Sequence, residues 1–195
     1  MKKVVAFDID GTITDYFEFM RGKIDDFHQK TGITLKADDN CVDSLRFPDM
    51  DAYDKFWELY ADEYLSVKIR DDIVKAINGL VDEGYEVYFV SHRGDKGWGT
   101  TKDNDKNWSI ENRTKDWLKE NEVKFTGVMC IEGRDKVQVL KKIKASYMVE
   151  DWGFYIDPKI GCKLYQIDGR YNINNNNGTR IENISQFFDA IKHME

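Results

Sequence analysis

The stretch VVAFDIDGT, from Val4 to Thr12, decides the fold of this chain. Its first four residues are apolar without interruption, a pattern typical of a parallel strand that is covered on both faces. Asp8, Asp10 and Gly11 follow, so the strand is expected to end at the edge of the sheet where open α/β proteins bind their ligands. Two carboxylates one residue apart repel each other, and they therefore indicate a bound cation or a shared proton.

Two other interpretations of Asp8 and Asp10 are a solvated acidic turn and a calcium-binding loop of the EF-hand type. The EF-hand loop has a helix before it and its glycine at the sixth position. Here a strand comes before Asp8, and Gly11 is the fourth residue of the stretch that begins there. The spacing excludes the calcium loop and leaves the acidic turn as the alternative to a functional site.

The composition limits the size of the protein and its partners. The chain has 195 residues with 41% hydrophobic content, enough for one sizeable core and a modest insertion. A net charge of −7 argues against a nucleic acid polymer or an anionic membrane as a partner, because both repel an acidic surface. No apolar run suits a signal peptide or a membrane span, so a cytoplasmic location is expected. Cys41, Cys130 and Cys162 lack the spacing of metal ligands and are interpreted as reduced thiols without a role.

The segment after the first strand changes character, because helical periodicity and dense aromatic residues replace the strand pattern. A first helix is expected to stop at Gly32, and a second is expected to begin near Pro48. The sequence therefore predicts a core formed by residues 1–14 and 67–195, with a small helical insertion at 15–66.

The rest of the chain alternates predicted helices and strands, as a parallel sheet with helices on both faces requires. Further strands are expected at 85–90, 125–131, 147–149 and 163–167, and helices at 71–83, 109–121, 135–143 and 184–191. This order predicts a doubly wound, mainly parallel, Rossmann-like α/β fold with a small helical segment inserted after the first strand. The polar stretch 94–107 is expected to be a loop on the substrate side of Ser91.

Polar side chains stand where several of these elements begin or end. Ser91 closes a predicted strand just before a glycine, where a small donor can reach a phosphoryl oxygen, and Arg93 is a candidate phosphate contact. Lys136 falls in the first turn of a helix, although the helix dipole favours acids there. Glu150 and Asp151 end another strand, so two strands end in paired acids, and such pairs suit a hard, oxygen-preferring cation. Taken singly, a turn serine and a solvated lysine are the simpler interpretations.

In this order the elements resemble the four motifs of the haloacid dehalogenase-like hydrolases, most of which are magnesium-dependent phosphatases and phosphotransferases. The first motif corresponds to Asp8–Thr12, the second to Ser91, the third to Lys136 and the fourth to Glu150–Asp151. The resemblance covers essentially the whole chain. It implies that the insertion, residues 15–66, is a cap that closes over the active site.

The resemblance also implies a mechanism. Asp8 would attack the substrate phosphorus to form an aspartyl-phosphate, and Asp10 would protonate the leaving oxygen and then activate water. An aspartate at this second position favours a phosphatase over an ion pump or a dehalogenase. Mg²⁺ would be held by the carboxylate of Asp8, the backbone carbonyl of Asp10 and Asp151, with Glu150 behind these ligands.

The transferring phosphoryl group needs donors for its developing charge. The resemblance assigns this contact to Ser91 and Lys136, and Thr12 and Arg93 are further candidates for phosphate binding. A non-catalytic binding module with the same fold is the alternative from another functional class. It is disfavoured because the chain has every acid needed for turnover.

Two short matches concern the substrate. Asp15-Tyr16 and Tyr171-Asn172 resemble positions of the 5′(3′)-deoxyribonucleotidase-like branch of the superfamily. This branch implies a 5′-nucleotidase for deoxyribonucleoside or ribonucleoside monophosphates, whose base would stack on Tyr16, Phe17 or Phe19. The alternative is that these aromatic rings fill the core of the insertion.

The sequence departs from that branch after the second motif. A proline often follows there, whereas this chain has Gly94 and a long polar loop. A phosphatase for another small metabolite, such as a sugar phosphate or phosphoglycolate, is therefore the alternative function. In both cases the partner is a small phosphorylated substrate. The oligomeric state has no signal in the sequence.

Overall fold

The computed structural model describes residues 3–37, 45–94, 109–131, 136–154, 156–169, 172 and 177–192. Several predictions therefore concern residues outside the described ranges. They are Cys41, the loop beyond Gly94, Asp135 as the start of a helix, and Tyr171.

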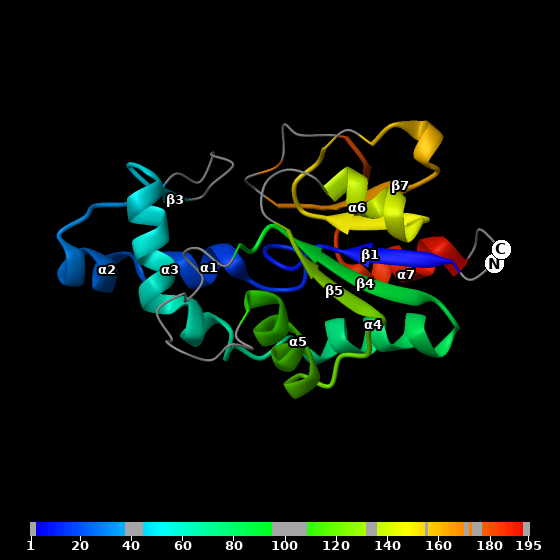
Figure 1. Cartoon of the computed structure of the whole chain (residues 1–195), viewed down its shortest axis with the longest axis horizontal. Coiled ribbons are helices and arrows are strands. Elements are labelled where there is room, and N and C mark those ends of the chain that lie inside the picture. Colours follow the sequence, from blue (N-terminus) through cyan, green and yellow to red (C-terminus); the bar gives the residue numbers. More distant parts are fainter. Residues whose placement is uncertain are drawn as a thin grey trace.

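Six parallel strands form the central sheet, in the order β5-β4-β1-β6-β7-β8 (Figure 1). Their bounds are β1 Val4–Phe7, β4 Glu86–Ser91, β5 Gly127–Cys130, β6 Tyr147–Glu150, β7 Lys163–Ile167 and β8 Thr179–Ile181. The chain runs from β1 to one edge and then returns to the other side of β1, so the strand order reverses there. In open α/β sheets this reversal creates the crevice in which ligands bind. The predicted doubly wound parallel fold is confirmed.

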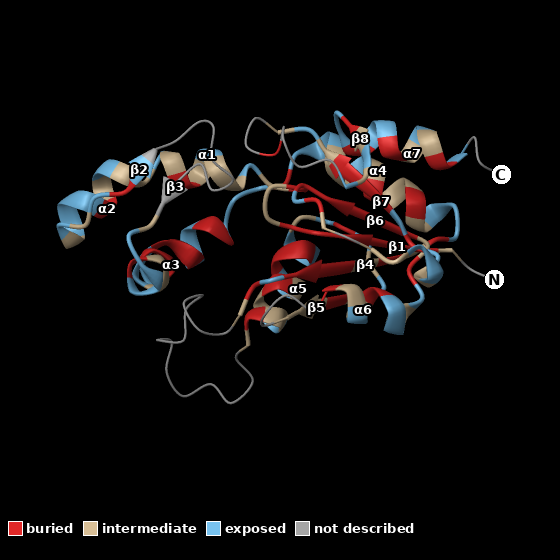
Figure 2. Cartoon of the chain, turned by 90° about the horizontal axis from the view of Figure 1, so that it is seen from above, coloured by how far each residue is buried: buried red, intermediate tan, exposed pale blue. Residues whose placement is uncertain are grey.

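Four helices cover the sheet. They are α4 (Asp71–Asp82), α5 (Ile110–Glu120), α6 (Lys136–Ile143) and α7 (Ile184–Lys192), and a short 3₁₀ helix spans Pro158–Ile160. The larger apolar core lies between the sheet and α4, α5 and α7, while a smaller core lies under α6. Figure 2 shows the buried strands between these helical layers.

Strand β1 is buried on both faces, which explains its uninterrupted apolar sequence. Val5 and Phe7 belong to the larger core, whereas Ala6 belongs to the core under α6. Side chains alternate between the two faces of a strand, so the next side chain in this series, Asp8, is directed to the α6 face. The same alternation directs Glu150 of β6 to that face, because Met148 also packs under α6.

Two acids, Asp71 and Asp72, stand at the beginning of α4, but neither is its N-cap residue. The N-cap residue is Arg70, and it makes no capping hydrogen bond with its side chain. Asp71 instead pairs with Lys68 at 2.8 Å, and Asp72 pairs with Arg70 at 2.6 Å. Both carboxylates are still stabilised by the positive end of the helix dipole, so acids occur here as they do at N-cap positions.

The insertion lies between β1 and β4 in sequence and away from the sheet in space (Figure 1). Its elements are α1 Tyr16–Arg21, α2 Ile24–Thr31, β2 Lys36–Ala37, β3 Leu45–Arg46 and α3 Met50–Tyr64. The predicted first helix is therefore two helices, although it ends as expected at Gly32, whose φ is 72°. Asp49 caps α3 by accepting a hydrogen bond from the backbone N–H of Ala52 at 2.8 Å. That the insertion acts as a cap stays a prediction.

Two observations complete the fold. Cys130 and Cys162 are free cysteines. Within the described ranges, none of the helices combines the length and the apolar character that crossing a membrane requires.

Candidate active site

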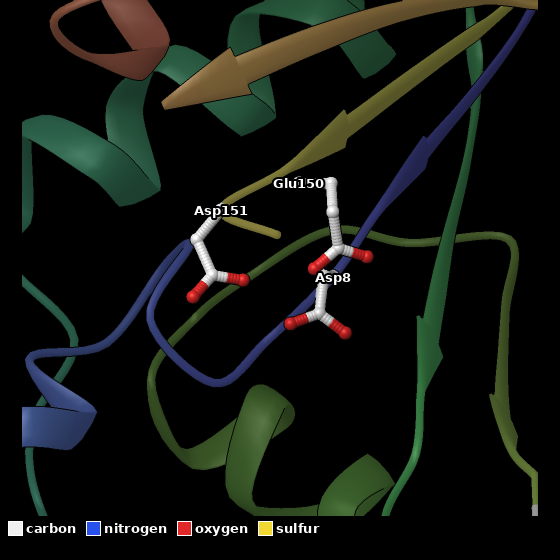
Figure 3. Close-up of side chains that lie close together, drawn as sticks. All are labelled: Asp8, Glu150 and Asp151. Carbon is white, nitrogen blue, oxygen red and sulfur yellow. The ribbon is translucent and has the colours of Figure 1, made fainter. Parts of the chain in front are cut away.

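Three carboxylates meet at the carboxyl ends of β1 and β6. Asp8, Glu150 and Asp151 each offer an oxygen, and these oxygens lie within 4.8 Å of one another (Figure 3). All three residues are buried, with at most 5% of their surface exposed. The backbone N–H of Asp8 donates to the carbonyl of Val149 at 2.9 Å, so strand pairing itself brings the two acidic strand ends together.

Lys136 is the basic residue of this cluster. Its Nζ lies 2.5 Å from Oδ1 of Asp8 and 2.5 Å from Oε2 of Glu150, and the residue is 4% exposed. Because α6 covers the face to which Asp8 and Glu150 are directed, its first residue reaches both acids. A lysine at the positive end of a helix is thus explained by two carboxylate partners.

Burial dominates the electrostatics of the cluster. Burial, together with the neighbouring Glu150 carboxylate, raises the pKa of Asp8 to about 7, although Lys136 opposes this shift. Burial likewise raises the pKa of Glu150 to about 8, opposed by Lys136 and reinforced by Asp151. Burial alone would lower the pKa of Lys136, but the two carboxylates outweigh it and raise this pKa.

The donor set fits a hard divalent cation. Within the described ranges, three buried carboxylates face the ammonium group of Lys136, so the ionised cluster has an excess of negative charge. Carboxylate and carbonyl oxygens are the ligands that Mg²⁺ prefers. Asp8 and Asp151 are therefore suited to hold such an ion, and that they do so stays a prediction. Glu150 lies within the same cluster, while its Oε2 accepts from Lys136.

The main chain of Asp151 is held by two buried amide side chains. Nδ2 of Asn172 donates to the carbonyl of Asp151 at 2.5 Å, and Nε2 of Gln166 donates to the same carbonyl at 3.3 Å. Asn172 also donates to the carbonyl of Ile167 at 2.7 Å and accepts from Nη2 of Arg180 at 2.8 Å. Sequence reasoning singled out Asn172 only by resemblance, and it missed Gln166 and Arg180.

Asp10 lies outside the three-carboxylate cluster, next to the sharp turn at Gly11, whose φ is 85°. Its carboxylate accepts from Nε of Arg93 at 2.9 Å and from Nη2 of the same guanidinium at 2.7 Å. The hydroxyl of Tyr64 donates at 2.8 Å, and that of Ser91 donates at 3.2 Å. Ser91 and Arg93 are predicted to contact phosphate. In this structure both donate hydrogen bonds to Asp10, the predicted acid/base.

Arg93 is 1% exposed and fully enclosed. Its Nη1 donates to Oγ1 of Thr114 at 3.2 Å, and its guanidinium carbon lies 5.5 Å from the ring centroid of Tyr64 and 5.4 Å from that of Trp117. Burial alone would lower the pKa of Arg93, but Asp10 outweighs it and raises this pKa. Nothing local in the sequence signals these contacts, since Tyr64 and Trp117 belong to distant helices.

The remaining predicted contacts lie around the turn and the insertion. The hydroxyl of Thr12 is buried and has no hydrogen-bond partner among the described residues. The ring of Tyr16 stacks on Trp57, with centroids 5.5 Å apart and an angle of 22° between the planes. Phe19 lies nearly parallel to the same indole, at 6.5 Å and 10°. These two rings thus pack inside the insertion, and their contact with a substrate stays a prediction.

Phe17 has a different environment. It meets the edge of Tyr16 at 5.1 Å, and both rings line a cavity of about 510 Å³. The N-terminal residues of α4 and α7 and the stretch from Gly11 to Glu18 also line this cavity, whereas Asp8 does not.

No known family model and no curated protein matches this chain in sequence. Solved structures do match. A protein from Clostridium difficile, provisionally described as a phosphatase, has a TM-score of 0.66 and 19% identity over 97% of this chain and 98% of that one. A predicted phosphoglycolate phosphatase from Haemophilus somnus 129pt has a TM-score of 0.63 and 13% identity, over 100% of this chain and 98% of that one. A haloacid dehalogenase-like family hydrolase from Streptococcus pneumoniae has a TM-score of 0.62 and 12% identity, over 100% of this chain and 99% of that one.

The chain has the fold of the haloacid dehalogenase-like hydrolases. At these levels of identity the likeness concerns the fold, so the chemistry has to be argued from the residues. In this haloacid dehalogenase-like fold, Asp8 stands where the strand order of the sheet reverses, and Lys136 and Asp151 lie beside Asp8. The finer resemblance to the deoxyribonucleotidase-like branch stays a prediction.

Proposed function

We propose that this protein is a magnesium-dependent phosphomonoesterase for a small phosphorylated metabolite and acts through an aspartyl-phosphate on Asp8. The observation that carries the proposal is the contact of Asp8 with Lys136 beside Glu150 and Asp151 at the carboxyl end of β1. This arrangement offers a nucleophile, a fixed positive charge and oxygen ligands for a cation within one buried cluster.

In the first half of the reaction, an oxygen of Asp8 attacks the phosphorus and the ester P–O bond breaks. Asp10 gives its proton to the departing oxygen, so that an alcohol leaves. Lys136 remains against Asp8 and balances charge on the nucleophile and the phosphoryl oxygens. Mg²⁺ held by Asp8, Asp151 and the carbonyl of Asp10 would add positive charge at the same oxygens.

In the second half, Asp10 takes a proton from water, and the water oxygen attacks the phosphorus of the aspartyl-phosphate. The bond between phosphorus and the Asp8 oxygen breaks, which releases inorganic phosphate and restores the carboxylate. Ser91 and Thr12 are proposed phosphoryl contacts in both halves, because Ser91 ends β4, the neighbour of β1, and Thr12 follows Asp8 by four positions.

Two observations favour a small metabolite over a nucleotide. The rings of Tyr16 and Phe19 already stack on Trp57, so one face of each ring is covered within the insertion. A solved structure of the same fold is described as a predicted phosphoglycolate phosphatase. Nucleoside monophosphates are the second candidate, supported by the Asp15-Tyr16 match and by Phe17, which lines a cavity.

The deciding experiment measures phosphate release from a panel of esters that includes phosphoglycolate, sugar phosphates, nucleoside monophosphates and an aryl phosphate. We expect hydrolysis with Mg²⁺, none with excess chelator, and none with Asp8→Asn, because an amide is neither an anionic nucleophile nor a good magnesium ligand. Faster turnover of nucleotides than of every small metabolite would select the second candidate. Persistent activity in Asp8→Asn would overturn the mechanism.

A further inference from the structure

One buried tyrosine of the insertion contacts a catalytic group of the core. Tyr64 is the last residue of α3 and is 1% exposed. Its hydroxyl donates to Oδ1 of Asp10 at 2.8 Å and lies 2.5 Å from Oγ1 of Thr14. A hydroxyl has one proton to donate, so while Tyr64 donates to Asp10 it can only accept from Thr14. The Thr14 hydroxyl also lies 3.1 Å from the carbonyl of Ile9.

Arg93 also holds this carboxylate. Its two nitrogens form a fork on Oδ1 and Oδ2, a geometry that fixes the plane of a carboxylate as well as its position. The ring of Tyr64 lies over this guanidinium, with 5.5 Å between the ring centroid and the guanidinium carbon. The tyrosine therefore supports Asp10 directly through its hydroxyl and indirectly through Arg93.

Among the described residues, four donors reach the Asp10 carboxylate, about as many as its lone pairs can accept. Ser91 makes the longest of the four contacts, at 3.2 Å, and it is also the proposed phosphoryl contact. When Ser91 turns to a phosphoryl oxygen, one position on Oδ2 becomes free for the proton that Asp10 passes to the leaving oxygen. Tyr64 and Arg93 are the donors that remain.

We propose that Tyr64 and Arg93 are positioning residues for Asp10, and that helix α3 of the insertion fixes the orientation of the acid/base through the Tyr64 hydroxyl. The inference rests on the proposed function and adds to it a specific link between insertion and core. Because Tyr64 acts through Asp10, its effect is confined to the steps in which Asp10 moves a proton.

The test compares Tyr64→Phe with the wild-type enzyme on two esters. An alkyl phosphate needs proton donation to its leaving group, whereas p-nitrophenyl phosphate does not. We expect kcat/KM, which reports formation of the aspartyl-phosphate and not its breakdown, to fall by about tenfold for the alkyl ester, a small part of the roughly 10²–10⁴-fold that general acid catalysis supplies. The aryl ester should lose less than about threefold in kcat/KM. The phenylalanine keeps the packing of the ring against Trp57 and Phe19.

Tyr60→Phe is the matched control. Tyr60 also belongs to α3 and is buried, but its hydroxyl donates to Asp26 at 2.7 Å, within the insertion. Removing that hydroxyl should leave the ratio of alkyl to aryl turnover as in the wild type. An equal loss on both esters in Tyr64→Phe, or a change of the ratio in Tyr60→Phe, would indicate a general structural effect and overturn the proposal.

A double-mutant cycle gives the second readout. In an Asp10→Asn background, the further change Tyr64→Phe should have no additional effect on alkyl-ester turnover, because the residue through which it acts is gone. Additive losses would contradict a positioning role. If the wild-type enzyme hydrolyses no ester, the proposed function itself is wrong. An active wild type with an unchanged ester ratio in Tyr64→Phe removes only the role of Tyr64.

Discussion

The ammonium nitrogen of Lys136 lies 2.5 Å from Oδ1 of Asp8, although 128 positions separate the two residues in sequence. The fold brings these two atoms together, because the Asp8 side chain at the end of β1 is directed to the face that α6 covers, and Lys136 is the first residue of α6. The lysine also contacts Glu150, so one positive charge stabilises the proposed nucleophile and its acidic neighbour together.

Lys136→Met should lower kcat/KM by about a hundredfold or more, because a buried charge opposite the developing phosphoryl charge is lost. Lys141→Met is the control, since Lys141 is an exposed residue of the same helix. Steady-state kinetics with an aryl phosphate measures both variants. Activity of Lys136→Met within about threefold of the wild type would show that this charge is not used in the reaction.

The stability of the metal-free protein should fall as the pH rises from about 6 to 8. The pKa values of about 7 for Asp8 and about 8 for Glu150 lie above those of the unfolded chain, so the folded state binds more protons in this range. Stability decreases with pH wherever the folded state binds more protons than the unfolded state. Urea unfolding in excess chelator at several pH values measures the slope.

Mg²⁺ competes with these protons and should therefore stabilise the protein more at pH 8 than at pH 6. Asp8→Asn supplies the control, because it removes one of the two groups and should reduce the slope of the metal-free protein. A metal-free stability that rises from pH 6 to pH 8 in the wild type would contradict this account of the cluster.

Asn172→Ala should weaken Mg²⁺ binding by about tenfold to a hundredfold, the range found when groups behind metal ligands are removed. The variant loses the shorter of the two hydrogen bonds to the carbonyl of Asp151, while that from Gln166 remains. Asn183→Ala serves as the control, since the Asn183 side chain accepts from the backbone N–H of Gln186 at the start of α7. Calorimetric titration with Mg²⁺ reports affinity without turnover. Equal affinity in the wild type and Asn172→Ala would show that Asp151 needs no such support.

Tyr16→Ala should lower the melting temperature and reduce turnover of all esters to a similar degree, because the ring stacks on Trp57 in the insertion. An aromatic pair of this kind contributes about 0.5–1.5 kcal/mol beyond the area it buries. Thermal unfolding and a substrate panel measure the two effects. A raised KM for nucleotides alone, at an unchanged melting temperature, would instead support contact between Tyr16 and a base.

Much of the fold was predictable because its strands are buried on both faces or end in a recognisable way. The strand at 163–167 has the predicted bounds, and the apolar run before Asp8 is β1. Very short elements escaped prediction for the opposite reason. Strand β8 has three residues and the strands of the β2-β3 hairpin have two each, too few for a periodic pattern.

In the candidate site, too, some residues could be predicted from the sequence and others could not. Asp8, Glu150 and Asp151 follow strands, so sequence order and strand pairing suffice to bring them together. The hydroxyl of Tyr64 meets Asp10 across 54 positions, and in sequence Tyr64 is one member of an aromatic helical stripe. Arg93 was noticed, but its enclosure beside Asp10 depends on two helices that no local pattern connects with it.

The central place of β1 also affects how the chain is made. Synthesis proceeds from the N-terminus, so Val4–Phe7 leaves the ribosome long before either of its neighbours, β4 and β6. Until Tyr147–Glu150 has been made, one edge of this apolar strand lacks its ladder partner, and such edges favour aggregation. Nascent chains that stop before β6 are therefore expected to need a chaperone, and a ribosome that pauses there exposes the cell to an insoluble fragment.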